Sequence, residues 1–242
     1  MIAIRLIARL LDYPEQEFFD HQDELLAALL EADELSGEQK NTLAEIIRHC
    51  AERPLLDLQS DYCELFDRGR ATSLLLFEHV HGESRDRGQA MVDLMSQYRA
   101  DGLDLDAREL PDHLPLYLEY LAQGGLERVR RGLQDVAPIL ALLAARLEQR
   151  SSIYAQLFPL LLALSGSSAT PEALQSQVAS EARDDTPQAL DAVWEEEQVS
   201  FIARMNPQGE GCSATTHHRR FAGAVTPQYL DVSTLGQASR GE

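Results

Sequence analysis

Residues 126–147 read LERVRRGLQDVAPILALLAARL, and large apolar side chains recur along them at alternating spacings of three and four residues. Such spacing places the side chains on one face of an α-helix. The positions that form this face are Leu126, Val129, Leu133, Val136, Leu140, Leu143 and Leu147. The stretch predicts a long central helix that bends near Pro138, because proline lacks a backbone donor and crowds the preceding turn.

Apolar stripes with the same period occur before and after this stretch. They occupy residues 3–11, 18–29, 43–50, 55–66, 91–98 and 153–164. The alternation of apolar and polar residues that is typical of strands is scarce. Ser36 and Gln39 have the spacing of a capping box, and Thr170 and Thr186 each precede a proline, as capping hydroxyls at the start of a helix often do. The pattern predicts an all-α fold, a compact single-domain helical bundle of about eight to ten helices.

The helical period fails near residue 205. Beyond it, Gly, Ser, Thr and Pro become frequent. Chain ends of this composition carry few side chains that could dock on a core. We therefore predict a helical domain over residues 1–205 and a flexible C-terminal tail over residues 206–242.

The chain is strongly acidic, with 40 Asp and Glu against 21 Lys and Arg and a formal net charge of -19. A surface of this sign repels nucleic-acid phosphates and anionic lipid headgroups, and it attracts cationic partners. The 3 cysteines have no CxxC or metal-finger spacing, which indicates reduced thiols. Arg5 and Arg9 interrupt the first apolar stretch, and no run approaches the ~18 apolar residues of a membrane helix. These features predict a cytoplasmic protein that binds no nucleic acid and does not insert directly into the membrane.

A short apolar run, Leu74 to Phe77, is bracketed by dense charge and by glycines within residues 66–88. It is too short for a helix with its own buried stripe, so we predict a turn or short helix that closes one end of the bundle. Four side chains that can bind metals follow it: Glu78, His79, His81 and Glu83. Three interpretations stay open: a zinc or iron site, a buried loop whose side chains satisfy backbone groups, and the rim of a binding groove.

Residues 112–121 read DHLPLYLEYL and predict a helix that is apolar around more than half of its circumference. Asp112 is expected to cap this helix, and Pro115 falls in its first turn, where proline is tolerated. Leu114, Tyr117, Leu118 and Leu121 form one stripe, and Leu116 and Tyr120 form a neighbouring one. Such a helix is either deeply buried or packs one face on the bundle and another on a ligand, and tyrosines with polar tips suit a groove.

The sequence carries no catalytic motif that we can identify. It has no GxSxG, P-loop or GxGxxG pattern, and no cysteine lies in a suggestive position beside a histidine. The single lysine, Lys40, leaves little room for Schiff-base chemistry. We therefore predict that the protein is not an enzyme.

Three segments resemble the NarJ family, the dedicated assembly chaperones of respiratory nitrate reductase within the wider group of redox-enzyme maturation proteins. The first is residues 65–70, LFDRGR, running into residues 76–91, LFEHVHGESRDRGQAM. The second is residues 109–121, ELPDHLPLYLEYL, and the third is residues 184–199, DDTPQALDAVWEEEQV. The similarity extends from about residue 3 to residue 205, which makes it far more specific than a short motif.

The resemblance implies an all-α cytoplasmic chaperone that catalyses no reaction and holds no cofactor of its own. Members of the family bind the N-terminal segment of the apo catalytic (alpha) subunit of respiratory nitrate reductase. They keep that subunit open for insertion of its molybdenum cofactor before it docks at the membrane. The Pro-Asp-His…Glu pattern of the wider group is associated with signal-peptide recognition, and it matches Asp112, His113 and Glu119 here.

A client segment of this kind is an amphipathic helix that would lay its apolar face in a groove while acidic residues hold its charged face. We expect the groove floor at Leu74, Phe77, Leu116, Tyr117 and Tyr120 and its acidic rim at Glu78, Asp112 and Glu119. His79, His81 and His113 are also expected among the peptide-binding residues. Two alternatives stay open: a metal-dependent helical enzyme that uses Glu78, His79, His81 and Glu83, and a general protein-binding adaptor.

Overall fold

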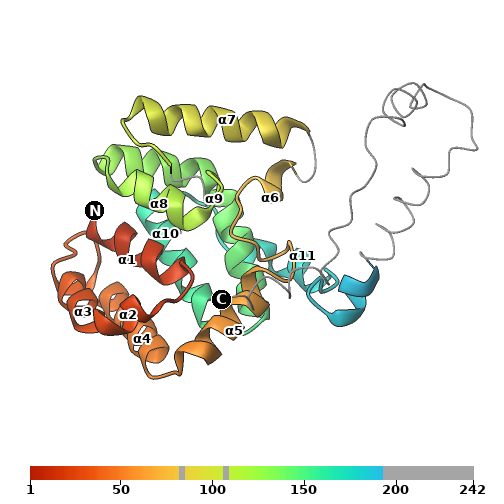
Figure 1. The fold of residues 1–242 in the computed structure, drawn as a ribbon, viewed down its shortest axis with the longest axis horizontal. Helices are drawn as coiled ribbons and strands as arrows, with labels where there is room; N and C mark the ends of the chain where they lie inside the picture. The colour runs from red at the N-terminus through yellow and green to blue at the C-terminus, as the bar shows by residue number, and fades with distance from the viewer. Residues whose placement is uncertain (82–84, 106–108, 193–242) are drawn as a thin grey trace, which may run out of the picture. The chain divides into compact units, whose positions relative to one another are not determined.

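A computed structural model describes residues 1–81, 85–105 and 109–192 of the chain (Figure 1). The α-helices are α1 (Ile2–Leu11), α2 (Gln16–Asp20), α3 (Gln22–Leu30), α4 (Gly37–Ala51), α5 (Leu55–Phe66), α6 (Glu78–His81), α7 (Arg85–Ala100), α8 (Leu114–Ala122), α9 (Leu126–Gln149), α10 (Leu157–Ser165) and α11 (Gln175–Ala179). Two 3₁₀-helices, η1 (Ile153–Gln156) and η2 (Glu172–Leu174), and a helical stretch over residues 187–192 also lie in the described residues, and the predicted all-α class is confirmed. The predicted boundary at residue 205 and the predicted tail lie outside the described residues.

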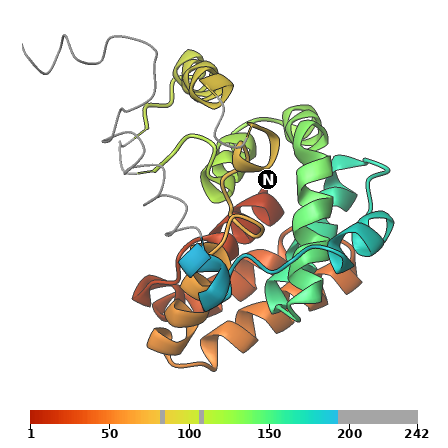
Figure 2. The same ribbon diagram turned by 90° about the vertical axis from the view of Figure 1, so that its right-hand side faces the viewer.

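Helix α9 lies at the centre of the bundle, as its apolar period predicts. Figure 2 shows α9 and α10 side by side, and α9 also packs against η1 and α11. The periodic side chains from Val129 to Leu147 are buried, except that Val136 is half-buried, whereas Leu126 at the start of the helix is 51% exposed. Pro138 lies inside the helix. In the described residues, no helix is long and apolar enough to cross a membrane.

Helix α1 packs along α8, and these two helices form the second layer of the core. Seven of the ten residues of α1 are buried, and so are seven of the nine residues of α8. The hydroxyl of Tyr62 on α5 donates a hydrogen bond to the Leu11 carbonyl at the end of α1, at 2.9 Å. This contact joins the first helix to the element that leads into the segment of residues 66–88.

Helical residues begin at all three positions predicted from hydroxyl side chains, and at two of them the hydroxyl caps the helix. The Ser36 Oγ accepts from the Gln39 N–H at 3.3 Å, and the Gln39 side chain accepts from the Ser36 N–H at 2.8 Å, which completes the capping box. The Thr186 Oγ1 accepts from the Ala189 N–H at 3.2 Å. The 3₁₀-helix η2 begins directly after Thr170-Pro171, but no side chain caps it, so only the capping role predicted for Thr170 is wrong.

Gly132 of α9 allows α8 and α9 to approach closely. A Cβ atom at this position would lie 2.4 Å from Leu121 Cδ2 and 3.0 Å from the Tyr117 hydroxyl, which itself donates to the Gly132 carbonyl at 3.1 Å. Both neighbours are buried, so they have little space to move aside. The absence of a side chain is therefore required by packing rather than by backbone conformation.

We expect Gly132→Ala to lower the free energy of unfolding by about 1–3 kcal/mol, because overpacking outweighs the better helix propensity of alanine. The matched control is Gly88→Ala in α7, where a Cβ would meet nothing within 4 Å. That change should raise the free energy of unfolding by about 0.5–1 kcal/mol. Urea unfolding measures both variants, and equal effects of the same sign would contradict the packing argument.

Candidate functional site

The two segments singled out by the sequence meet in the structure. The Leu76 N–H donates to the Asp112 carbonyl at 2.9 Å, and the Leu114 N–H donates to the Leu74 carbonyl at 2.8 Å. These bonds make an isolated antiparallel bridge between Leu75 and His113. The apolar run is therefore extended where it pairs with the chain entering α8, and the short helix α6 begins only after it.

Asp112 stabilises the start of α6 rather than the start of α8. Its side chain is fully buried, and Oδ2 accepts from the Phe77 N–H at 3.0 Å. The residue preceding α8 is His113, which makes no side-chain capping bond, so the prediction that Asp112 caps α8 is wrong. The physical reason is that Phe77 directly precedes α6, where backbone N–H groups lack partners within the helix.

An ion-pair triad surrounds this carboxylate. Arg87 of α7 donates from Nη1 to Glu78 Oε1 at 3.1 Å, and its Nη2 lies 4.0 Å from Asp112 Oδ2. Asp112 Oδ1 and Arg87 Nε are buried without a hydrogen-bond partner among the described residues. Burial raises the pKa of Asp112, and the Phe77 N–H and the Arg87 charge oppose this only in part. The triad joins α7 to the paired segments, although burial of the Asp112 carboxylate is unfavourable.

The histidines near α6 are engaged within the protein. The His79 Nε2–H donates to the Ser73 carbonyl at 2.8 Å, since a carbonyl can only accept, and this bond fixes the tautomer of the neutral ring. Burial lowers the pKa of His79. The His81 ring packs edge-to-face against Phe77 with a centroid distance of 5.8 Å. Phe77 itself is half-buried.

The described residues contain no group of three or more His, Cys, Asp or Glu side chains placed to hold a metal ion. Glu78 is paired with Arg87, and His79 is bonded to Ser73. Glu83, the fourth residue of the metal hypothesis, lies outside the described residues. These contacts agree with the interpretation in which the side chains form hydrogen bonds within the protein, to a backbone carbonyl for His79 and to Arg87 for Glu78.

A cavity of about 520 Å³ opens beside the paired segments. Its lining residues are Tyr62, Phe66, Asp67, Arg68, Gly69, Arg70, Ser73, Leu74, Leu75, Glu78, Glu109, Leu110 and His113. The apolar part includes Tyr62, Phe66 and Leu74, each 4% exposed. The charged part comprises Asp67, Arg68, Arg70, Glu78 and Glu109, and His113 Nδ1 lies 3.7 Å from Glu109 Oε2. Of the residues predicted to bind a peptide, Leu74, Glu78 and His113 line this cavity.

The two tyrosines predicted for the groove floor lie elsewhere, in the packing of α8 against its neighbours. The Tyr117 hydroxyl bonds to the Gly132 carbonyl of α9. The Tyr120 hydroxyl donates to Asp101 Oδ2 at 2.6 Å, and the Arg128 guanidinium lies 4.8 Å from the centroid of its ring. Both side chains are at most 9% exposed, and neither lines the cavity. Their polar tips are satisfied inside the protein.

Leu116 and Glu119 also lie outside the cavity lining. Leu116 is half-buried and packs against the core. Partial burial raises the pKa of Glu119, and the charge of Asp12 on the α1 side raises it further, against the opposing effect of Arg9. The charged neighbours of Glu119 thus belong to the α1 side of the molecule, whereas His113 faces the cavity.

Sequence reasoning missed the loop of residues 67–70, which supplies four consecutive residues of the cavity lining. Its charges and its glycine had marked the segment as unusual, but no local spacing indicates that the loop faces a cavity. It also missed Glu109 and Leu110, the first two residues of the second segment, as lining residues. Leu110 is 43% exposed and adds an apolar surface at the cavity edge.

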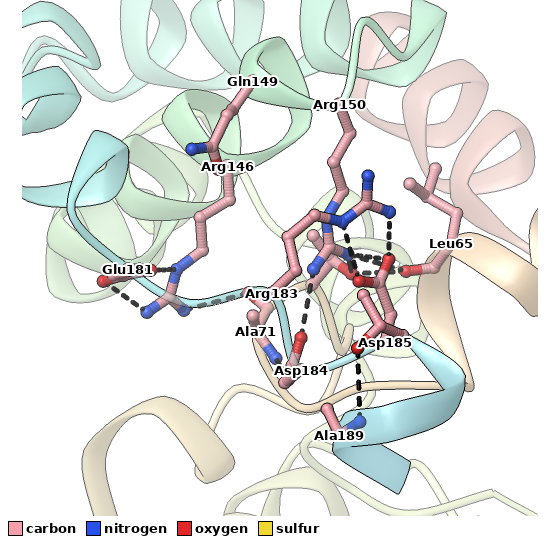
Figure 3. A network of polar contacts seen from close by, with 12 residues as sticks. Leu65, Ala71, Arg146, Gln149, Arg150, Glu181, Arg183, Asp184, Asp185 and Ala189 are labelled. Carbon is pink, nitrogen blue, oxygen red and sulfur yellow. Dashed lines mark hydrogen bonds and ion pairs between the residues drawn. The ribbon is translucent and has the colours of Figure 1, made fainter.

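Behind the loop, two arginines at the C-terminal end of α9 bind carboxylates from residues 181–185 (Figure 3). Arg146 donates from Nε and Nη2 to the two oxygens of Glu181, at 2.8 and 3.0 Å. Arg150 Nη2 donates to Asp184 Oδ1 at 3.1 Å, and the Arg150 side chain is only 7% exposed. The bidentate pair and the buried guanidinium hold this part of the chain on α9.

A second bidentate pair lies in the same network. Arg183 donates from Nε and Nη2 to the oxygens of Asp185 at 2.9 and 2.6 Å. This hydrogen bonding is the main reason that the pKa of Asp185 is lowered, and Arg150, 3.8 Å away, acts in the same direction. The surroundings of Asp185 therefore lower its pKa, whereas those of Asp112 raise its pKa.

Residues 30–159 match the family described as "Nitrate reductase delta subunit", and the chain belongs to this family. The chain is 58% identical to the nitrate reductase molybdenum cofactor assembly chaperone NarJ of Escherichia coli K12, over 98% of this chain and 100% of that protein. It is 49% identical to the probable chaperone of the same kind, NarW of Escherichia coli K12, over 98% of this chain and 99% of that one. It is 31% identical to the probable NarJ of Bacillus subtilis 168, over 67% and 87% of the two chains. The resemblance found in the sequence is thereby confirmed.

The buried carboxyl of Asp112 makes stability depend on pH. Because its pKa is raised, this group favours the fold most when protonated, below its unfolded pKa of about 3.9, and the benefit is lost as the pH rises through the folded value. Asp112→Asn carries no charge but keeps an oxygen for the Phe77 N–H. The free energy of unfolding of this variant should therefore increase relative to that of the wild type as the pH rises from about 4 to about 7. Urea titrations across this range measure the difference.

Asp185→Asn is the matched control with the opposite sign. The lowered pKa of Asp185 means that its carboxylate stabilises the fold above its unfolded pKa, and this contribution is lost as the pH falls through the folded value. The control should thus lose stability near neutral pH and approach the wild type in acid. If the advantage of the wild type over Asp112→Asn instead grew toward neutral pH, pairing with Arg87 would outweigh burial.

Proposed function

We propose that the protein is a system-specific chaperone of respiratory nitrate reductase. It binds the N-terminal segment of the apo catalytic subunit in the cytoplasm and keeps this subunit competent for molybdenum cofactor insertion before membrane docking. The observation that carries this proposal is the 58% identity to a nitrate reductase molybdenum cofactor assembly chaperone over the full length of that protein. The proposal assigns the chain no catalytic reaction of its own.

The cavity beside the paired segments supports a binding function. Its apolar floor offers burial to one face of an amphipathic client segment, and its charged edge offers partners to the polar face. Asp67, Glu78 and Glu109 line the edge together with Arg68 and Arg70, so side chains of both charges are present there. The net charge of -19 favours the approach of a basic segment from a distance.

The position of the client segment differs from the groove expected from sequence. We place it on the cavity lined by Leu74, Leu110 and His113 rather than over Tyr117 and Tyr120, whose hydroxyls are bonded within the protein. Asp112 then acts indirectly, because it holds the Phe77 backbone beside the paired segments. Contributions from Phe77, which precedes α6, and from His79 and His81 on α6 stay part of the proposal, because Glu78 of the same helix lines the cavity.

The test is calorimetric titration of the full chain with a synthetic peptide of about fifteen residues, roughly four helical turns, from the N-terminus of the nitrate reductase catalytic subunit. We expect tight binding of this peptide and no binding of a scrambled version. Equal affinity for unrelated amphipathic peptides would indicate a general adaptor. No binding of the native peptide to the folded protein would contradict the proposal.

Leu110→Ala tests the place of binding. Leu110 is 43% exposed at the cavity edge, so its truncation should leave stability nearly unchanged but weaken peptide affinity by about tenfold, or about 1.4 kcal/mol. Leu126→Ala is the matched control, because Leu126 is 51% exposed and does not line the cavity. The same loss of affinity in both variants would remove the client segment from this cavity.

A further inference from the structure

We infer that Asp184 is a positioning residue of the client-binding cavity, acting through the backbone of residues 69–71. This inference rests on the proposed function, because it concerns the same cavity. Asp184 does not line the cavity beside the paired segments. Its carboxylate instead contacts the loop that does, from a position 113 residues later in the chain than Ala71.

The carboxylate makes one contact with each of its oxygens. Asp184 Oδ2 accepts from the Ala71 N–H at 2.7 Å, and Oδ1 accepts from Arg150 Nη2 at 3.1 Å (Figure 3). A Cβ atom on Gly69 would lie 2.6 Å from Asp184 Oδ1. The loop backbone thus lies directly against the carboxylate, and a side chain at position 69 would force the carboxylate to shift.

The arginines of α9 make this contact rigid. Arg150 donates to the Leu65 carbonyl at 3.5 Å and bonds to the Thr72 hydroxyl, so it touches both ends of the loop. Arg146 donates from Nη1 to the Ala71 carbonyl at 2.9 Å. Asp184 completes the arrangement by joining Arg150 to the Ala71 N–H at the C-terminal end of the loop. The hydrogen bonds of Arg146, Arg150 and Asp184 therefore hold the conformation of residues 67–70, which form one wall of the cavity.

The chemistry requires a carboxylate rather than an amide. Both contacts of Asp184 come from donors, an amide N–H and a guanidinium N–H, and each needs an acceptor oxygen. Asparagine has the same size but only one oxygen, and its NH₂ group would face a second donor. Asp184→Asn should therefore lose one of the two contacts and leave the loop less well held.

The experiment titrates the same client peptide into full-length Asp184→Asn and Glu181→Gln. Glu181 is the matched control, because it belongs to the same segment, its substitution changes the net charge equally, and its carboxylate hydrogen bonds go to Arg146, whereas the Asp184 carboxylate bonds to the Ala71 N–H. We expect Asp184→Asn to bind about tenfold more weakly, as for the loss of one charge-assisted hydrogen bond, and Glu181→Gln to bind as the wild type does. The titrations are run where circular dichroism finds all variants folded. Thermal unfolding of each variant is recorded alongside, since a merely structural role would lower stability in both without separating their affinities.

A variant pair provides the second measurement. Gly69→Ala should weaken peptide binding in the wild-type background, where its Cβ meets the carboxylate, but not in the Asp184→Ala background, where the space is free. An equal effect of Gly69→Ala in both backgrounds would overturn the inference. Wild-type affinity in Asp184→Asn would also overturn it, while the proposed function would stand. Failure of the wild type to bind the peptide would overturn both.

Discussion

Two backbone hydrogen bonds, between Leu76 and Asp112 and between Leu114 and Leu74, determine how the rest of the site is arranged. The leucines that make these bonds, Leu74, Leu76 and Leu114, are at most 4% exposed, so their polar backbone groups must pair within the protein. The pairing directs His113 toward the cavity and brings the Asp112 carboxylate to the Phe77 N–H. Cavity, triad and the start of α6 therefore depend on one short contact between distant segments.

The elements that could be predicted from sequence are those whose evidence is local. The period of α1 and the capping box at Ser36 involve residues within one or two turns, and both are present as expected. Asp112 has the spacing of a cap for α8, yet it bonds to a backbone group 35 residues earlier. A competing donor at that separation, here the Phe77 N–H, leaves no trace in the local pattern.

The candidate site was only partly predictable for a related reason. Periodicity places Tyr117 and Tyr120 on apolar faces of α8, but it does not say which neighbour covers each face. The ring of Tyr98 on α7 lies 4.4 Å from that of Tyr120, and Gly132 of α9 receives the Tyr117 hydroxyl. Both faces are thus covered by the protein itself. The contact between Asp184 and Ala71, which spans 113 residues, is likewise invisible to any local spacing.

The packing of α1 on α8 has a consequence for the synthesis of the chain. Helix α1 ends at Leu11 and α8 begins at Leu114, so about a hundred residues separate the first helix from its main partner. At ribosomal rates of about 5–20 residues per second, roughly 5–20 s pass between the emergence of the two helices. During that time an apolar helix face is without its native cover. A protein proposed to shield the N-terminal segment of its client thus exposes an apolar face of its own first helix during synthesis.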